Sequence, residues 1–324
     1  MLDSLPEWPL FGLADDARPA LERARTAGEP LALATIVALD GGGPRPVGTQ
    51  MAIGVGGCSG FLSGGCLEGD VVAHAASVLE DGAPRRLVYG QGSPWPDIRL
   101  LCGARIEVQL ERLPPDDAAT TTLLDLMARR RPAVWISDGL RRACADADAP
   151  PPSWQGGFKK RFDPVPRLVV LGSDPTALAI AALGAQSGCE TTLVRPKGPA
   201  EPPPLAGVAY RRDDPAEALA AIGLDPWTAV TVATHDAETD HAALLAALPS
   251  AAFYVGALGA RRRLPDRQLW LRQAGLQERD IARLRAPIGL DIGGKAPWEV
   301  AIAVMGEMIA ERVRLSLGDS EGLV

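Results

Sequence analysis

The 324-residue chain is poor in aromatic side chains, in cysteine and in long apolar runs, and each shortage excludes a class of protein. Aromatic residues make up only 5%, so the broad stacking platforms of single-strand nucleic-acid binders are not expected. The net charge of −7 also argues against nucleic acid or an anionic membrane as the main partner. No apolar run reaches the length of a membrane span, and the first residues lack the pattern of a secretory signal.

The cysteines form neither a C-x-x-C pair nor a zinc-like spacing, and they lie at positions 58, 66, 102, 144 and 189. An odd number of thiols fits reduced cysteines in a cytoplasm better than a disulfide framework. The overall composition, 47% hydrophobic and 23% charged, is typical of a soluble protein. We therefore expect a cytoplasmic protein in which Cys144 and Cys189 are bystander thiols.

The chain divides into two halves with different apolar patterns. Residues 1–144 combine predicted helices with strands, including a hairpin over residues 50–62 and an alternating strand over residues 105–111, and predict a small α/β domain. Residues 145–166 are rich in Pro, Gly, Asp and Ser and predict a linker. Residues 167–324 alternate apolar strands with helices, which is typical of a Rossmann-type, doubly wound parallel sheet.

The most informative segment of the first half is residues 62–69, where a predicted strand turns into a predicted helix. Backbone N–H groups at a helix N-terminus suit an anion such as phosphate, and they favour the thiolate of a cysteine placed there. Cys66 is therefore a candidate nucleophile or soft-metal ligand, although a small buried side chain is the alternative. Cys102, directly before Gly103, is a second thiol beside a predicted turn. The candidate residues are Gly64, Gly65, Cys66, Glu68, Cys102 and Gly103.

An arginine lies between two prolines in the loop Pro44-Arg45-Pro46. Because proline restricts the backbone, less entropy is lost when Arg45 is ordered against an anion. The alternative is a rigid loop that carries a solvated arginine.

The second half opens like a dinucleotide fold, but its first turn departs from that pattern. The turn Gly172-Ser173-Asp174-Pro175 lacks the second and third glycines of G-x-G-x-x-G. Asp174 would bring negative charge near the phosphates, whereas Arg195 at the end of the next strand would suit a ribose phosphate. We therefore expect NAD(P) to bind poorly, and keep Gly172 as a candidate contact.

Polar or glycine-rich turns follow other apolar segments of this half. In the turn of residues 234–236, His235 would act as an acid–base group or ligand, or its neighbours would simply cap the next helix. Residues 256–261 form a possible phosphate turn, or a turn that needs glycine for steric reasons. Asp291 places a carboxylate in the last glycine-rich loop, residues 288–295. The candidate residues are Thr234, His235, Asp236, Gly256, Gly259, Arg261 and Asp291.

Together these motifs resemble the XdhC/CoxI family of accessory proteins for molybdenum-cofactor enzymes such as xanthine dehydrogenase. The matching segments occur in family order and are residues 42–51, 62–68, 102–103, 234–236 with Asp240, 254–261 and 286–293. The resemblance implies an XdhC/CoxI-type domain followed by a Rossmann-type domain. Departures occur at Ser173-Asp174-Pro175, Arg195, Ala104 and Ala260. The first two weaken the expectation of bound NAD and leave the cysteine site intact.

The resemblance also implies the function. The protein would bind molybdenum cofactor, support its sulfuration and deliver it to the large subunit of a molybdenum hydroxylase, without being an enzyme itself. A cysteine desulfurase would be a second partner, and the chain would form a homodimer. Cys66, and Cys102 with it, would contact the molybdenum or its dithiolene sulfur environment.

Two other classes of function remain open. One is an NAD(P)-dependent oxidoreductase that uses the Rossmann-type half, with His235 as the acid–base group. The other is a scaffold that docks partners without any small-molecule ligand.

Overall fold

The computed structural model describes residues 5–91, 93, 100, 103–150 and 156–320, with side chains described as far as residue 315. The chain forms two compact units, Met1–Pro164 and Val165–Val324. None of the helices in these ranges has both the length and the apolar character that crossing a membrane requires.

The first unit is built on a five-stranded antiparallel sheet with the order β3-β2-β1-β5-β4. A second sheet of three antiparallel strands has the order β7-β6-β8. The strands are β1 (Leu31–Asp40), β2 (Gln50–Gly54), β3 (Gly57–Gly60), β4 (Arg85–Gly90), β5 (Arg105–Leu113), β6 (Ala133–Ser137), β7 (Arg142–Asp146) and β8 (Phe158–Phe162). The helical segments are η1 (Leu10–Gly12), α1 (Arg18–Ala27), α2 (Glu68–Asp81) and α3 (Ala118–Ala128).

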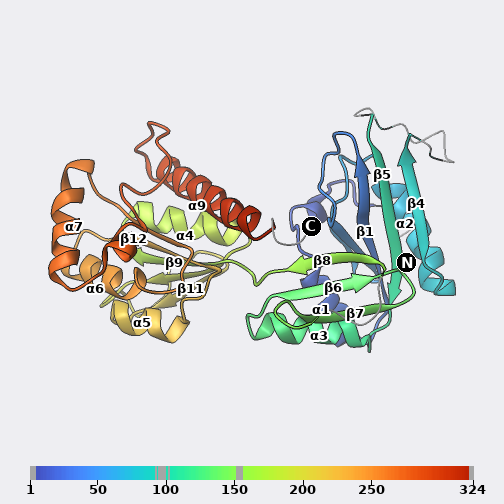
Figure 1. Ribbon diagram of the computed structural model, residues 1–324, viewed down its shortest axis with the longest axis horizontal. Coiled ribbons are helices and arrows are strands. Elements are labelled where there is room, and N and C mark those ends of the chain that lie inside the picture. The colour runs from blue at the N-terminus through green and yellow to red at the C-terminus, as the bar shows by residue number, and fades with distance from the viewer. Residues whose placement is uncertain (1–4, 92, 94–99, 101–102, 151–155, 321–324) are drawn as a thin grey trace. The chain divides into compact units, whose positions relative to one another are not determined.

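Alternation along the strands gives the five-stranded sheet two apolar faces. Ala32, Ala34 and Ile36 of β1 pack with α2 in one core, while Leu31 and Leu33 pack in another. The second core also holds α1, α3 and the three-stranded sheet, and Figure 1 shows α2 beside β4 and β5. The predicted alternation over residues 105–111 is confirmed, because Ile106, Val108 and Leu110 are fully buried in the first core.

Two strands of the first unit lie in segments for which the sequence predicts none. Residues 158–162, inside the predicted linker, form β8 and pair with β6. The segment Phe-Lys-Lys-Arg-Phe has too few apolar residues to stand out among the surrounding glycines and prolines. Strand β7, on the other side of β6, is half-buried along its whole length and shows no alternation of buried and exposed residues.

The second unit is a six-stranded sheet whose paired strands are all parallel, in the order β11-β10-β9-β12-β13-β14. Its strands are β9 (Arg167–Gly172), β10 (Glu190–Val194), β11 (Val208–Arg211), β12 (Thr228–Ala233), β13 (Tyr254–Ala257) and β14 (Leu284–Arg285). Its helical segments are α4 (Pro175–Gln186), α5 (Pro215–Ile222), α6 (Ala237–Ala247), η2 (Arg261–Arg263), α7 (Leu264–Gln273), α8 (Glu278–Ile281) and α9 (Pro297–Ser320).

Helices cover both faces of this sheet, as the continuous apolar strands require. Helices α4 and α9 share one core with the sheet, and α5, α6, α7 and α8 share the other, so that α4 and α5 lie on opposite sides (Figure 1). The strand order reverses between β9 and β12, which makes their carboxyl ends the topological switch point of the sheet. The predicted doubly wound, Rossmann-type fold is therefore confirmed.

Candidate functional site

Three loops leave the same end of the five-stranded sheet in the first unit. The last residue of β1, Asp40, is paired with the first residue of β5, Arg105, which in turn is paired with Gly90 at the end of β4. At the same end, Met51 at the start of β2 is paired with Gly60 at the end of β3. The antiparallel register thus brings the loops of residues 41–49 and 61–67 to the end of the sheet where residues 103–104 lead into β5. The described candidates here are Arg45, Gly64, Gly65, Cys66 and Gly103.

The cysteine loop is held from inside by a buried carboxylate. Glu68 is only 1% exposed, and its Oε1 accepts the N–H groups of Leu62 and Ser63 at 3.0 and 2.6 Å. Its Oε2 accepts the Ser63 hydroxyl at 2.8 Å and the N–H of Leu67 at 3.2 Å. Because both oxygens of the carboxylate already accept these hydrogen bonds, Glu68 fixes the conformation of the loop.

The outer part of this loop faces solvent. Cys66 is exposed, and its N–H donates to the Ser63 hydroxyl at 3.1 Å. Gly64 and Gly65 are also exposed, and a Cβ built on either would meet no heavy atom within 4 Å. Gly65 has φ +97°, a conformation that glycine adopts readily. The loop therefore presents the Cys66 thiol and the solvent-exposed peptide groups of Gly64 and Gly65 directly before the N-terminus of α2.

The arginine loop is fixed by neighbours that the sequence analysis did not identify. Arg45 forms an ion pair with Asp15, and its buried Nε has no acceptor among the described residues. Lys160 of β8 donates to the carbonyl of Gly48 at 2.7 Å and lies 4.7 Å from the centre of the Phe162 ring. Burial lowers the pKa of Lys160 to about 8. No local pattern marks Lys160, because only the pairing of β8 with β6 brings it to this loop.

The third loop contributes one described candidate. Gly103 is exposed, and a Cβ built on Gly41 would lie 3.8 Å from its carbonyl oxygen, so the two loops are in contact. Cys102 lies outside the described residues. Within the described part of the chain, no three His, Cys, Asp or Glu side chains come together as a metal site.

At the switch point of the second unit, two side chains bridge the neighbouring turns. Oδ2 of Asp174 lies 3.1 Å from Nε2 of His235, and Oδ1 accepts the N–H of Ala177 at 2.8 Å and caps α4. The N-terminus of α4, where a pyrophosphate would bind in a dinucleotide fold, is thus occupied by a carboxylate of the chain. Gly172 has a steric role, since an added Cβ would lie 2.6 Å from that of Ala177.

The other polar residues of the predicted turn at 234–236 make local bonds. Asp236 caps α6 by accepting the N–H of Thr239 at 2.8 Å. Thr234 donates to Oδ1 of Asp240, whose Oδ2 accepts from Arg267 at 3.0 Å. These contacts agree with the capping alternative for Asp236, and both His235 and Asp236 are exposed.

The last two candidate turns of this unit face each other through an ion pair. Arg261 and Asp291 lie 2.9 Å apart, and both side chains are about three-quarters exposed. Gly256 is buried, and a Cβ there would lie 2.6 Å from the Ile288 side chain, whereas Gly259 is exposed. Arg195 is half-buried directly after β10, and its N–H donates to the carbonyl of Arg211.

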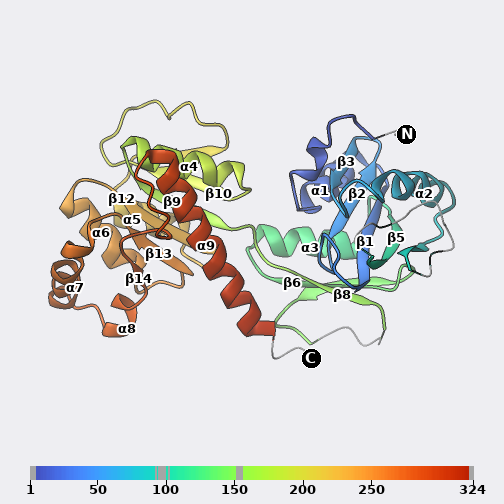
Figure 2. The same cartoon turned by 90° about the horizontal axis from the view of Figure 1, so that it is seen from above.

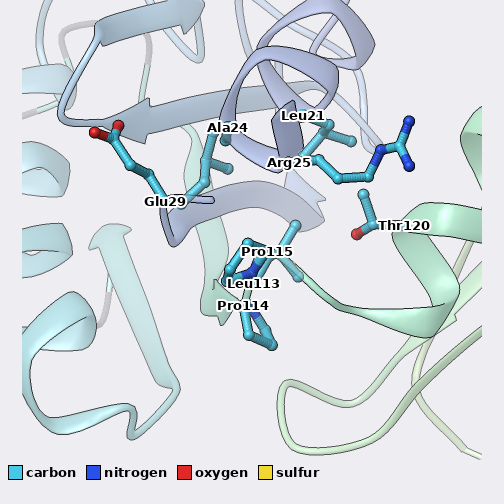
Figure 3. A pocket seen from close by; sticks show the side chains of 9 residues that line it. Leu21, Ala24, Arg25, Glu29, Leu113, Pro114, Pro115 and Thr120 are labelled. Carbon is cyan, nitrogen blue, oxygen red and sulfur yellow. The ribbon is translucent and has the colours of Figure 1, made fainter. Parts of the chain in front are cut away.

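A shallow pocket in the first unit lies away from the loops described above. It is lined by Leu21, Ala24, Arg25, Glu29, Leu31, Leu113, Pro114, Pro115 and Thr120 (Figure 3). Leu31 begins β1 and Leu113 ends β5, so this pocket is at the opposite end of the sheet from Cys66. It contains none of the candidate residues.

Comparison with known proteins gives matches across both units. The model of the XdhC and CoxI family matches residues 24–90, and the model of the XdhC Rossmann domain matches residues 168–308. The molybdenum cofactor insertion chaperone PaoD of Escherichia coli (strain K12) is 29% identical over 306 residues, which cover 93% of this chain and 90% of that protein. A probable xanthine dehydrogenase subunit of Bacillus subtilis (strain 168) is 24% identical over 89% of this chain and 95% of its own length.

A solved structure supports the fold. The crystal structure of a xanthine dehydrogenase from Bacillus halodurans superposes with a TM-score of 0.74 at 24% identity, over 93% of this chain and 96% of that one. Both family matches occur in the order that the resemblance implies. Both units of the chain are therefore similar to proteins of the XdhC and CoxI family.

Proposed function

We propose that this protein is a non-catalytic chaperone that carries molybdenum cofactor as its cargo and inserts it into a molybdenum hydroxylase. The observation that carries the proposal is the exposed Cys66 thiol, held beside two open peptide groups at the N-terminus of α2. An insertion chaperone among the relatives, similar over most of both chains, supports it.

The residues at this end of the sheet suit the chemistry of such a cargo. A phosphate group needs N–H donors and positive charge, which the backbone at Gly64 and Gly65 and the guanidinium of Arg45 would supply. A thiolate is a soft ligand for molybdenum or a neighbour for its sulfur environment. We assign these contacts to Arg45, Gly64, Gly65, Cys66 and Gly103, with Cys102 as the second thiol.

Glu68 is assigned to this site as the residue that positions the loop, because its carboxylate is already occupied by loop donors. In the second unit taken by itself, the side chains of His235 and Arg261 are about three-quarters exposed, and we propose them as candidate ligand contacts of that unit.

Three further parts of the proposal rest on the family resemblance. The chaperone would hold the cofactor during sulfuration by a cysteine desulfurase, would pass it to the large subunit of the hydroxylase, and would work as a homodimer in the cytoplasm.

Anaerobic binding of molybdenum cofactor to the purified full chain tests the proposal. Wild type should bind the cofactor in a ratio near one per chain, and Cys66→Ala should weaken binding and lower the activity of hydroxylase loaded by it. Cys144→Ala is the matched control, because this half-buried thiol of the same unit has its pKa raised to about 12 by burial. A folded Cys66→Ala protein that binds and loads normally would remove Cys66 from the site.

The alternative is an NAD(P)-dependent oxidoreductase. The half-buried Arg195 after β10 favours this alternative. The carboxylate of Asp174, which lies at the turn where a dinucleotide phosphate would bind, disfavours it. Titration with NADPH in the same experiment separates the two. Saturable NADPH binding by a protein that does not bind molybdenum cofactor would support the oxidoreductase.

A further inference from the structure

A short segment of the first unit connects the cysteine loop with the arginine loop. The ring of Phe11 lies 6.0 Å from the ring of Phe61, the first residue of the cysteine loop. At the other end of the segment, the carboxylate of Asp15 forms the ion pair with Arg45. Figure 2 shows this part of the chain, in dark blue, next to β3 and α1. We call residues 11–15 the strap, because they run from one loop to the other.

The strap is held loosely between these two contacts. Leu13, Ala14 and Asp15 are exposed, and they lie between the last residue of η1 and the first residue of α1. Among the described residues, the N–H groups of Ala14 and Asp15 donate to no backbone carbonyl. Since an ion pair with an exposed carboxylate is weak in water, Asp15 can leave its partner without unfolding the sheet.

The partner of Asp15 belongs to a group of charged side chains that is rich in cations. The charges that act on the ammonium of Lys160 are those of Asp15, Asp16, Arg18 and Arg45. Asp16 is already paired with Arg18 at 2.8 Å. Moving Asp15 away therefore leaves an excess of positive charge at Arg45 and Lys160, which attracts an anion.

Arg45 also has hydrogen-bonding capacity that Asp15 does not use. Its Nη2 meets the carboxylate, while its buried Nε has no acceptor among the described residues. A buried donor without an acceptor is unfavourable. A phosphate group offers more acceptor oxygens than a carboxylate and binds a guanidinium through parallel hydrogen bonds, so it would satisfy Arg45 more completely than Asp15 does.

We propose that Asp15 is an internal competitor for the phosphate group that Arg45 binds, so that the arriving phosphate displaces Asp15 and opens the strap. This role rests on the proposed function, because it takes Arg45 as a contact of the cargo's phosphate. A chaperone has to release what it binds. The return of Asp15 to Arg45 neutralises the arginine as the cargo leaves, which favours its transfer to the acceptor.

Calorimetric titration of the full chain with inorganic phosphate tests the competition. Asp15→Asn should bind phosphate about tenfold more tightly than wild type, because the competing carboxylate and its repulsion of phosphate are both removed. Arg45→Met should lose this binding. Asp81→Asn is the matched control and should bind as wild type does, since Asp81 is an exposed carboxylate of the same unit that pairs with Arg85 at 2.6 Å.

The two variants distinguish failure of this role from failure of the proposed function. If Arg45→Met binds phosphate as wild type does, Arg45 is not a phosphate contact, and the cargo contact assigned to it is wrong as well. If Arg45→Met loses phosphate while Asp15→Asn binds it no better than wild type, only the competition by Asp15 is overturned. Absence of phosphate binding by both wild type and Asp15→Asn overturns the competition too.

Transfer of the cargo tests the release step with the cofactor itself. Loaded with molybdenum cofactor, Asp15→Asn should pass it to the hydroxylase about tenfold more slowly than wild type, since nothing replaces the phosphate at Arg45. An unchanged transfer rate in Asp15→Asn would show that the return of Asp15 has no part in release.

Discussion

Replacing Glu68 by glutamine should loosen the cysteine loop while leaving the sheet below it intact. The amide is nearly the same size as the carboxylate, so no cavity is created. Its oxygen can still accept from the N–H groups of Leu62 and Ser63, as Oε1 does now. Its NH₂ group, however, would stand where Oε2 accepts the N–H of Leu67, and two donors would then face each other.

The expected cost follows from these contacts. A buried donor without an acceptor costs roughly 1–3 kcal/mol, and the remaining bonds weaken because a neutral oxygen accepts less strongly than a charged one. Glu68→Gln should therefore lower the free energy of unfolding of the first unit by about 3 kcal/mol. For a unit of this size, that corresponds to a fall in Tm of roughly 6–12 °C.

Native-state hydrogen exchange measures the effect where it arises. The amides of Leu62, Ser63 and Leu67 should exchange about 100-fold faster in Glu68→Gln, since each 1.4 kcal/mol is a factor of ten. Glu80→Gln, an exposed carboxylate on the same helix, is the control and should change neither quantity. Unchanged protection of these amides in Glu68→Gln, or equal losses in the two variants, would refute the reasoning.

Two further predictions concern the same end of the sheet. The buried amine of Lys160 has a pKa of about 8 against an ordinary 10.5, so between these values the unfolded chain binds more protons and stability should rise with pH. Denaturant unfolding of wild type and Lys160→Met should differ in this rise, and equal pH profiles would contradict the buried position. Gly90→Ala should lower stability by about 3 kcal/mol, because the backbone has φ +83° and the new methyl group would overlap the carbonyl oxygen of Ala104. Gly82→Ala, at φ +72° without a backbone neighbour, should cost only about 1 kcal/mol, and equal losses would argue against the overlap.

The periodic spacing of apolar residues in the sequence was sufficient to predict most of the helices and strands. The helix after Cys66 begins one residue later and ends two residues later than the predicted range of 67–79, and Pro297 begins the last helix as predicted. These elements depend on local properties, namely which side chains repeat on one face and which residues start a helix. Strand β8 was not found because its partner β6, and not its own composition, makes it a strand.

The sequence by itself determined the resemblance to a family, the fold class of each half and the position of a thiol between a strand and a helix, because each is written in contiguous residues. Only the tertiary structure decided which of these residues meet. The register of β1 with β2 and β5 brings three distant loops to one edge, and burial turns Glu68 inward instead of toward a ligand. Likewise, Asp174 and His235 are 61 residues apart in sequence and become neighbours only because β9 and β12 are adjacent in the sheet. Strand pairing and burial are non-local, so no local pattern could have revealed these contacts.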